Sequence, residues 1–152
     1  MLTGKKIIVT GSNGALGKAT VEAAQDYGAL VTGFDISYVK NDSYWRKVDL
    51  LSRQEIKREV EELDRVDGLI NVAGGFAMGN STFEENSEEW TAMQDMNVNS
   101  LRNMLSTVVP RMVKAKRGSI VNIGAQAAMR GAAYMSSYIV AKSAVIRITE
   151  SL

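Results

Sequence analysis

The feature that most constrains the fold is a glycine-rich turn placed directly between a short apolar segment and a helical one. Ile7-Ile8-Val9 lies in the segment Lys5–Thr10, which has the length and residue types of a buried parallel strand. Gly11 follows at once, and Gly17 comes six residues later at the start of a helix expected over Lys18–Tyr27. Glycine permits a tight turn, and the unpaired N–H groups of a helix start bind anions. This segment therefore predicts a phosphate-binding connection from strand to helix.

Apolar and helical segments alternate along the rest of the chain. Further strands are expected over Ala29–Phe34, Trp45–Leu50, Gly68–Ala73 and Ser119–Ile123, and helices over Ser52–Val66, Ser87–Ala115 and from Ser136 or Ser137 to the end. Pro110, the only proline, is expected to kink or break the longest helix. This order favours an α/β fold with a parallel sheet and helices on both faces, formed by one domain over residues 1–152.

Composition excludes several classes of protein. The 18 basic and 17 acidic side chains form no long run of one sign, which argues against a nucleic-acid partner. No apolar stretch approaches the ~18 residues of a membrane span, and no signal peptide is evident at the start, so we expect a cytoplasmic protein. The chain has no cysteine and no histidine, so we expect no metal site. Acid–base chemistry must then use carboxylates, lysine or tyrosine.

An acidic residue at the end of the second expected strand indicates which cofactor the turn would bind. Asp35 follows Gly17 by 18 residues. A carboxylate there can accept hydrogen bonds from both ribose hydroxyls of an adenosine, and it repels a 2′-phosphate. Neither Asn13 nor Ile36 supplies the positive charge that such a phosphate needs, and Lys40 is expected to be solvated. The sequence therefore favours NAD as the cofactor over NADP.

Tyr138 and Lys142 provide an acid–base pair on the last expected helix. Because they are four residues apart, their side chains share one face of that helix. An ammonium near a phenol favours the phenolate form of the phenol. A tyrosine tuned in this way can donate a proton to a carbonyl oxygen or accept one from an alcohol.

Together these motifs resemble the short-chain dehydrogenase/reductase family over essentially the whole chain. Asn71-Val72-Ala73-Gly74 resembles the family's Asn-Asn-Ala-Gly motif, and Asp49-Leu50 resembles its adenine-contacting pair. Trp90, followed seven residues later by Asn97, resembles the helix that carries its active-site asparagine, for which Asn99 is a rival candidate. In the glycine turn, Ala15 replaces a glycine of the family's short form. Read instead as Gly-x-x-Gly-x-x-Gly, the same turn resembles the extended, sugar-nucleotide-epimerase branch, but the Asn71–Gly74, Asp49-Leu50 and Trp90–Asn97 motifs favour the short, classical form.

The resemblance implies a Rossmann-type fold and hydride transfer between a nicotinamide and a small-molecule substrate. It implies three catalytic roles: Tyr138 as proton donor or acceptor, Lys142 as the group that tunes Tyr138 and anchors the ribose, and Asn97 as the holder of a relay water. The residues expected to contact the cofactor are Gly11, Asn13, Ala15, Leu16, Gly17, Asp35, Asp49, Leu50, Asn71, Ala73, Gly74, Tyr138 and Lys142.

One residue departs from the family pattern at the position of its catalytic serine. Gly118-Ser119-Ile120-Val121-Asn122-Ile123 resembles the strand before that serine, but position 125 is alanine. A methyl group cannot polarise a carbonyl, and losing one such donor typically lowers the rate by about 10²–10³. Three interpretations stay open. The substrate needs no such hydroxyl, as in the dihydropteridine reductases that Gly124-Ala125-Gln126 also resembles; Gln126, Ser136 or Ser137 substitutes; or catalysis is weak or absent.

The chain is also shorter than members of this family usually are. We expect the sheet to lack the last strands of the family fold, and the domain to be incomplete at its C-terminus. The apolar residues Val145, Ile146, Ile148 and Leu152 should then face a missing segment or another subunit, and we expect a homo-oligomer, a dimer or a tetramer. Two functions remain: an NAD(P)-dependent oxidoreductase acting on a carbonyl, alcohol or pterin-like substrate, and a non-catalytic dinucleotide-binding or dimerising module.

Overall fold

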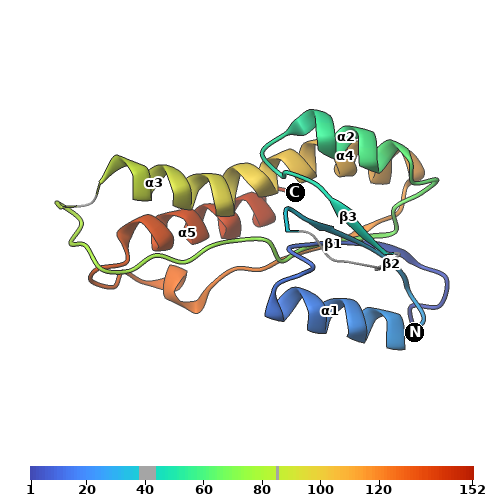
Figure 1. The fold of residues 1–152 in the computed structure, drawn as a ribbon, viewed down its shortest axis with the longest axis horizontal. Helices are drawn as coiled ribbons and strands as arrows, with labels where there is room; N and C mark the ends of the chain where they lie inside the picture. The colour runs from blue at the N-terminus through green and yellow to red at the C-terminus, as the bar shows by residue number, and fades with distance from the viewer. Residues whose placement is uncertain (38–43, 85) are drawn as a thin grey trace.

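The computed structural model describes residues 1–37, 44–84 and 86–152. Lys40 lies outside these residues. Five parallel strands form one sheet, shown in Figure 1. They are β1 (Lys6–Thr10), β2 (Leu30–Asp35), β3 (Trp45–Lys47), β4 (Gly68–Asn71) and β5 (Ser119–Asn122). Their spatial order is β3-β2-β1-β4-β5. The chain adds β2 and β3 on one side of β1, and β4 and β5 on the other, so the strand order changes direction between β1 and β4. This confirms the expected doubly wound, Rossmann-type sheet, and ligands bind such sheets at the carboxyl side of that reversal.

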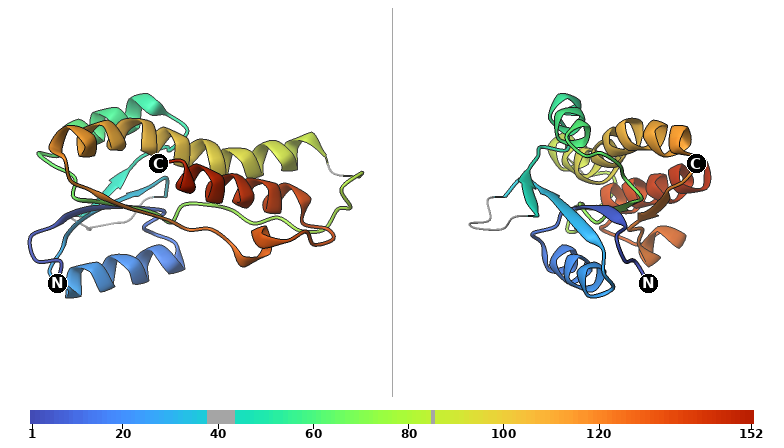
Figure 2. Two further views of the ribbon diagram at one scale, coloured as in Figure 1. Left: turned by 180° about the vertical axis from the view of Figure 1, so that it is seen from behind. Right: turned by 90° about the vertical axis from the view of Figure 1, so that its right-hand side faces the viewer.

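Helices cover both faces of the sheet (Figure 1, Figure 2). On one face lies α1 (Ala15–Asp26); on the other lie α2 (Arg53–Glu61) and α4 (Ser100–Ala115). Two helices, α3 (Ser87–Gln94) and α5 (Ser136–Glu150), run side by side and extend beyond the carboxyl ends of the strands. The short turn η1 (Asp95–Asn99) joins α3 to α4, and η2 (Gln126–Met129) precedes α5.

Strand β1 shows how the sequence pattern builds two hydrophobic layers. Successive side chains of a strand point to opposite faces of its sheet. Ile7 and Val9 accordingly pack in a cluster with Val21 of α1, whereas Ile8 packs in a larger cluster on the opposite face. That larger cluster joins β1, β2 and β4 to α2, α4 and α5 through Phe34, Val48, Ile56, Val60, Leu69, Leu101, Met104, Leu105, Val108, Met112 and Val145.

The expected and observed bounds of most segments differ by one to three residues, and the larger differences concern the third strand, the second helix and the long helix. The third strand stops at Lys47, because Val48 turns into the core and the Asp49 amide donates to the Glu55 carboxylate. Helix α2 stops at Glu61 rather than Val66. The Arg111 guanidinium donates to the Val60 carbonyl in the last turn of this helix and to the Leu63 carbonyl just after it.

The long helix over Ser87–Ala115 is interrupted at η1, which is a π-helical turn, and not at Pro110. Pro110 lies inside α4, which continues past it to Ala115. At η1 the Asn97 side chain donates to the Met93 carbonyl, four residues earlier, at 3.0 Å. A side chain here occupies the acceptor that the main-chain N–H of a regular helix would use. The interruption therefore has a side-chain cause and not a proline cause.

The apolar residues of α5 do not all face outward as expected. Val145 is 3% exposed and packs in the larger cluster, because α5 lies against the same face of the sheet as α4. Ile148 is partly buried against the same cluster, whereas Leu152 is exposed. Among the helices of the described residues, none combines the length and apolar character needed to cross a membrane.

A buried carboxylate ties the amino ends of three strands together. Asp67 accepts hydrogen bonds from the Lys6 amide and the Arg65 guanidinium, both at 2.9 Å, and lies 3.4 Å from the Arg117 guanidinium. Its carbonyl accepts from the Ser119 amide of β5. The Lys6 hydrogen bond, then the Arg65 hydrogen bond, hold the pKa of Asp67 below its usual value.

We expect Asp67→Asn to lower the free energy of unfolding at pH 7 by roughly 1–3 kcal/mol, because it removes charge-assisted hydrogen bonds. The folded-state pKa lies below the unfolded value of about 3.9, so this contribution is fully present above that value and is lost as the pH falls through the folded pKa. Urea unfolding between pH 7 and pH 3 measures it. The matched control is Asp26→Asn, at the exposed end of α1. A difference between Asp67→Asn and wild type that persists undiminished at pH 3 would contradict the assignment.

Candidate active site

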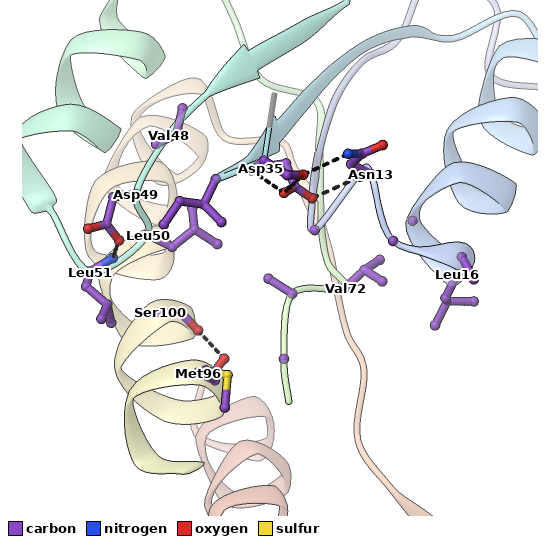
Figure 3. Close-up of a pocket in the computed structure, with 18 residues that line it drawn as sticks. Asn13, Leu16, Asp35, Val48, Asp49, Leu50, Leu51, Val72, Met96 and Ser100 are labelled. Carbon is purple, nitrogen blue, oxygen red and sulfur yellow. Dashed lines mark hydrogen bonds between the residues drawn. The ribbon is translucent and has the colours of Figure 1, made fainter. Parts of the chain in front are cut away.

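A cleft of about 600 Å³ opens at the carboxyl ends of the strands. Figure 3 shows Asn13 of the connection from β1 to α1 and Leu16 of the first turn of α1 on one side of it, and Asp49, Leu50 and Met96 on the other. Ten of the residues expected to contact a cofactor line this cleft: Gly11, Asn13, Ala15, Leu16, Gly17, Asp35, Asp49, Leu50, Ala73 and Gly74. The structure thus brings together residues that are spread over more than 60 positions of the sequence.

The glycine turn packs too closely for side chains at two of its three glycines. Gly11 has a φ of +63°, and a Cβ there would lie 2.8 Å from the Ala73 Cα. A Cβ at Gly17 would lie 2.0 Å from the Gly11 carbonyl oxygen, whereas one at Gly14 would make an ordinary contact at 3.5 Å. Gly11 and Gly17 are therefore required by packing, and Gly14 is not.

The start of α1 is left open toward the cleft. Gly14 is the N-cap residue and supplies no side-chain hydrogen bond to the first turn. The first N–H groups of a helix have no partner within the helix, and they carry the positive end of its dipole. Ala15 and Leu16, which begin the helix, line the cleft. A glycine cradle beside an uncapped helix start fits the pyrophosphate of a dinucleotide.

Asp35 lies at the edge of the cleft beside the glycine turn. One carboxylate oxygen accepts from the Asn13 amide at 2.9 Å, and the other accepts from the amide and hydroxyl of Ser37 at 2.9 and 2.7 Å. The Asn13 side chain also donates to the Ser37 hydroxyl at 2.7 Å. These bonds fix the negative charge of Asp35 at the end of β2.

The opposite wall of the cleft is held in place by an asparagine from a distant helix. Asn103 of α4 is 8% exposed. Its amide nitrogen donates to the carbonyls of Leu50 and Leu51 at 3.0 and 3.3 Å, and its oxygen accepts from the Arg53 guanidinium at 2.7 Å. Sequence reasoning missed Asn103, although a polar residue on the buried face of an amphipathic helix is a signal for such a contact.

Lys142 and Asn97 meet at the backbone that follows β4. A Cβ built on Gly74 would lie 2.7 Å from the Asn97 oxygen and 3.3 Å from the Lys142 nitrogen. Lys142 is 6% exposed and donates to the Ile123 carbonyl at 2.9 Å, and burial lowers its pKa below the usual value for lysine. Asn97 is buried and exchanges hydrogen bonds with the main chain of Gly75 at 3.1 and 3.2 Å. Both residues therefore border the segment that also lines the cleft.

Tyr138 lies against Phe76, which comes two residues after Gly74. Its ring packs edge-to-face on Phe76, with centroids 4.9 Å apart and an interplanar angle of 78°. It also packs with Met93, Val98 and Ala141, which join α3, η1 and α5. The phenol therefore lies at the carboxyl side of the sheet, on the side that carries the glycine turn.

Two asparagines among the candidates lie elsewhere. Asn71 is buried in β4 and donates to the Asn122 side chain of β5 at 2.8 Å, and it does not line the cleft. Asn99, the rival of Asn97, donates to the Asp95 side chain at 2.7 Å. The π-helical turn thus places Asn97, and not Asn99, beside Gly74.

The residues considered as replacements for the serine absent at position 125 differ in their exposure and hydrogen bonds. Ser137 is 1% exposed and donates to the Glu89 carboxylate at 3.0 Å, so its hydroxyl is engaged inside the protein. Gln126 begins η2 and is exposed. Ser143 donates to the Ala128 carbonyl at 3.2 Å. Of the three replacements considered, Gln126 is the one that the fold leaves at the surface.

Comparison with known proteins places this geometry in a family. The family model described as short chain dehydrogenase matches residues 5–152. The chain is 32% identical over 159 residues to dehydrogenase/reductase SDR family member 6 of Aquarana catesbeiana, covering 99% of this chain and 64% of that protein. It is 31% identical to the 3-oxoacyl-[acyl-carrier-protein] reductase of Thermotoga maritima, covering 99% and 67%. The chain thus spans just under two thirds of the length of the frog protein.

Solved structures agree on the fold. The aldohexose dehydrogenase of Thermoplasma acidophilum superposes with a TM-score of 0.90 at 27% identity, covering 99% of this chain and 60% of that one. An NAD⁺-bound xylitol dehydrogenase superposes with a TM-score of 0.93 at 23% identity, covering 99% and 64%. With the family match over nearly all residues, these findings show that the chain belongs to the short-chain dehydrogenase/reductase family.

Proposed function

We propose that this chain carries the cofactor-binding and acid–base half of an NAD-dependent oxidoreductase that acts on a carbonyl, an alcohol or a pterin-like substrate. The observation that carries the proposal is the segment over residues 74–76. Gly74 lines the cleft and lies beside Asn97 and Lys142, the Gly75 amide donates to Asn97, and the Phe76 ring contacts Tyr138. In this proposal, the dinucleotide site and the proton-transfer site would share one stretch of chain.

The residues of the cleft would hold a dinucleotide in an extended form. The glycine turn and the start of α1 would bind the pyrophosphate, Asp35 would accept the ribose hydroxyls of the adenosine, and Asp49 and Leu50 would border the adenine. When bound, this cofactor supplies or accepts the hydride. Lys142, which lies beside Gly74, would anchor the nicotinamide ribose.

Tyr138 and Lys142 would move the proton that accompanies the reduction. Tyr138 would donate it to a carbonyl oxygen or accept it from an alcohol. The buried Lys142 ammonium would stabilise the phenolate that remains, because charges interact strongly where water is excluded. Asn97, whose oxygen faces the same Gly74 backbone, would hold a water on the path from Lys142.

Ala125 favours a second candidate, a dinucleotide-binding module without catalysis. A methyl group at this position cannot stabilise an oxyanion.

Relatives act on different substrates by name: one is a 3-oxoacyl-[acyl-carrier-protein] reductase and another an aldohexose dehydrogenase. We propose that the substrate of this chain is one that accepts hydride with Tyr138 alone as the acid, and that self-association into a dimer or tetramer accompanies this function.

Asp35 predicts which cofactor binds. We expect NADH to bind at least about tenfold more tightly than NADPH, a difference of about 1.4 kcal/mol, because the fixed carboxylate repels a 2′-phosphate. Asp35→Asn should narrow that ratio, whereas Asp26→Asn, on the exposed end of α1, should not. Fluorescence titration with the two reduced cofactors gives both dissociation constants. Tighter binding of NADPH by the wild-type chain would rule out the assignment to Asp35.

Tyr138→Phe separates an enzyme from a module. We expect turnover to fall by about 10²–10⁴, the usual contribution of one positioned acid, while the dissociation constant for NADH changes by less than twofold. NADH oxidation is followed with a 3-oxoacyl thioester and a quinonoid dihydropterin as probes, and NAD⁺ reduction is followed with an aldohexose. Tyr27→Phe, at the exposed end of α1, is the control and should keep full activity. Undiminished turnover in Tyr138→Phe would exclude this residue as the acid.

Lys142 predicts that stability rises with pH, as Asp67 does, but in the alkaline range and because an unfavourable contribution is removed. Because burial lowers the pKa of Lys142 in the folded state, its charged form opposes folding at neutral pH, and this effect fades as the pH rises through the folded pKa toward about 10.5. We therefore expect wild type to gain stability relative to Lys142→Met between pH 7 and pH 10. Urea unfolding measures the difference. Lys18→Met, an exposed change on α1, should show no such trend, and a flat difference for Lys142→Met would refute the assignment.

A further inference from the structure

A carboxylate outside the cleft joins the two segments that flank Tyr138. Glu89 lies in the first turn of α3, and its backbone amide donates to the Asn86 N-cap. One oxygen of its carboxylate accepts from the Ser137 hydroxyl at 3.0 Å, and the other accepts from the side-chain amide of Asn80 at 3.3 Å. Asn80 belongs to the loop that follows β4, and Ser137 precedes Tyr138 in α5.

The Ser137 end of this link is buried. Ser137 is 1% exposed, and removal of the Glu89 carboxylate would take away the acceptor to which its hydroxyl donates. Leaving a buried hydroxyl unpaired is unfavourable, so the first turn of α5 would have to shift to satisfy it. Met135, the N-cap residue of α5, makes no side-chain hydrogen bond to that turn. Glu89 is therefore a principal polar restraint on the place where α5 begins.

The Asn80 end of the link lies next to a second connection between the same two segments. The Gly79 amide donates to the Tyr134 carbonyl at 3.0 Å. Tyr134 has a φ of +63°, a conformation that is unfavourable for a residue with a side chain and that persists only where its surroundings hold it. Phe76, whose ring packs on Tyr138, is in the same loop as Gly79 and Asn80.

We propose that Glu89 is a positioning residue, which holds the loop after β4 and the first turn of α5 together and thereby fixes Phe76 and the Tyr138 phenol in one arrangement. The inference rests on the proposed function for its effect on turnover, but not for its effect on structure. Glu89 touches neither the cleft nor the reacting atoms, so it acts through Ser137 and Asn80.

Hydrogen exchange of the 152-residue chain tests the structural part without any substrate. In Glu89→Ala we expect the Gly79 amide and the amides of Ile139 and Val140, which carry the first hydrogen bonds of α5, to exchange at least about tenfold faster, which corresponds to about 1.4 kcal/mol. Glu88→Ala is the matched control, because it removes the same charge from the same helical turn at an exposed side chain. Equal exchange rates in the two variants would overturn the proposal.

Kinetics test the positioning part. In Glu89→Ala we expect kcat/KM for the probe substrate to fall at least about tenfold while the NADH dissociation constant stays within twofold, because the cleft is not disturbed. Glu89→Gln should recover activity, since glutamine has the same length and keeps an oxygen that can accept from Ser137. Ser137→Ala should add little to Glu89→Ala in the double variant, because both changes break the same link.

The outcomes separate this proposal from the proposed function. If the wild-type chain binds NADH and shows no turnover, the oxidoreductase function of the chain fails, and hydrogen exchange still decides whether Glu89 restrains the two segments. If turnover is present, a loss of NADH affinity in parallel with kcat/KM would overturn the positioning role, because it would show a general disturbance of the fold. Full additivity of Glu89→Ala and Ser137→Ala would overturn it as well.

Discussion

The site depends on the close packing of the backbone after β4 between the glycine turn and two buried polar side chains. On one side, the Ala73 backbone approaches Gly11 so closely that no Cβ fits, and its amide donates to the Thr10 hydroxyl at 3.2 Å. On the other side, Gly74 touches Asn97 and Lys142. Because protein interiors are close-packed and resist local change, movement of this backbone segment would alter the cleft and the Asn97 and Lys142 side chains together.

Much of this arrangement could be predicted from local patterns. The strand after which Gly11 comes, the strand that ends at Asp35 and the helix that carries Tyr138 and Lys142 all show short apolar runs or regular spacing, and the structure confirms each. In a parallel sheet, the carboxyl ends of neighbouring strands share one edge. That rule alone indicates that Gly11, Asp35 and Gly74 meet, and they do line one cleft.

What could not be predicted are contacts between polar residues far apart in the sequence. Asn103 holds the Leu50 carbonyl across 53 positions, and Glu89 accepts from Ser137 across 48. Neither pair has a spacing rule, since each depends on how α4 or α5 packs against another element. A long-range contact also decides where Asn71 lies. The sequence motif is present, but the Asn71 side chain donates to Asn122 of β5, and Asn71 does not line the cleft. Whether Ala125 permits catalysis depends on a substrate, which no pattern in the chain specifies.

The π-helical turn between α3 and α4 has a consequence for how this protein could change. Such a turn accommodates one residue more than a regular helix would, and it is found most often at functional positions. Deletion of a single residue from Asp95–Asn99 would restore uniform helical hydrogen bonding but rotate Asn97 away from the buried ammonium that it faces across Gly74. The extra residue of the turn is therefore what keeps the Asn97 side chain beside Gly74 and the Lys142 ammonium.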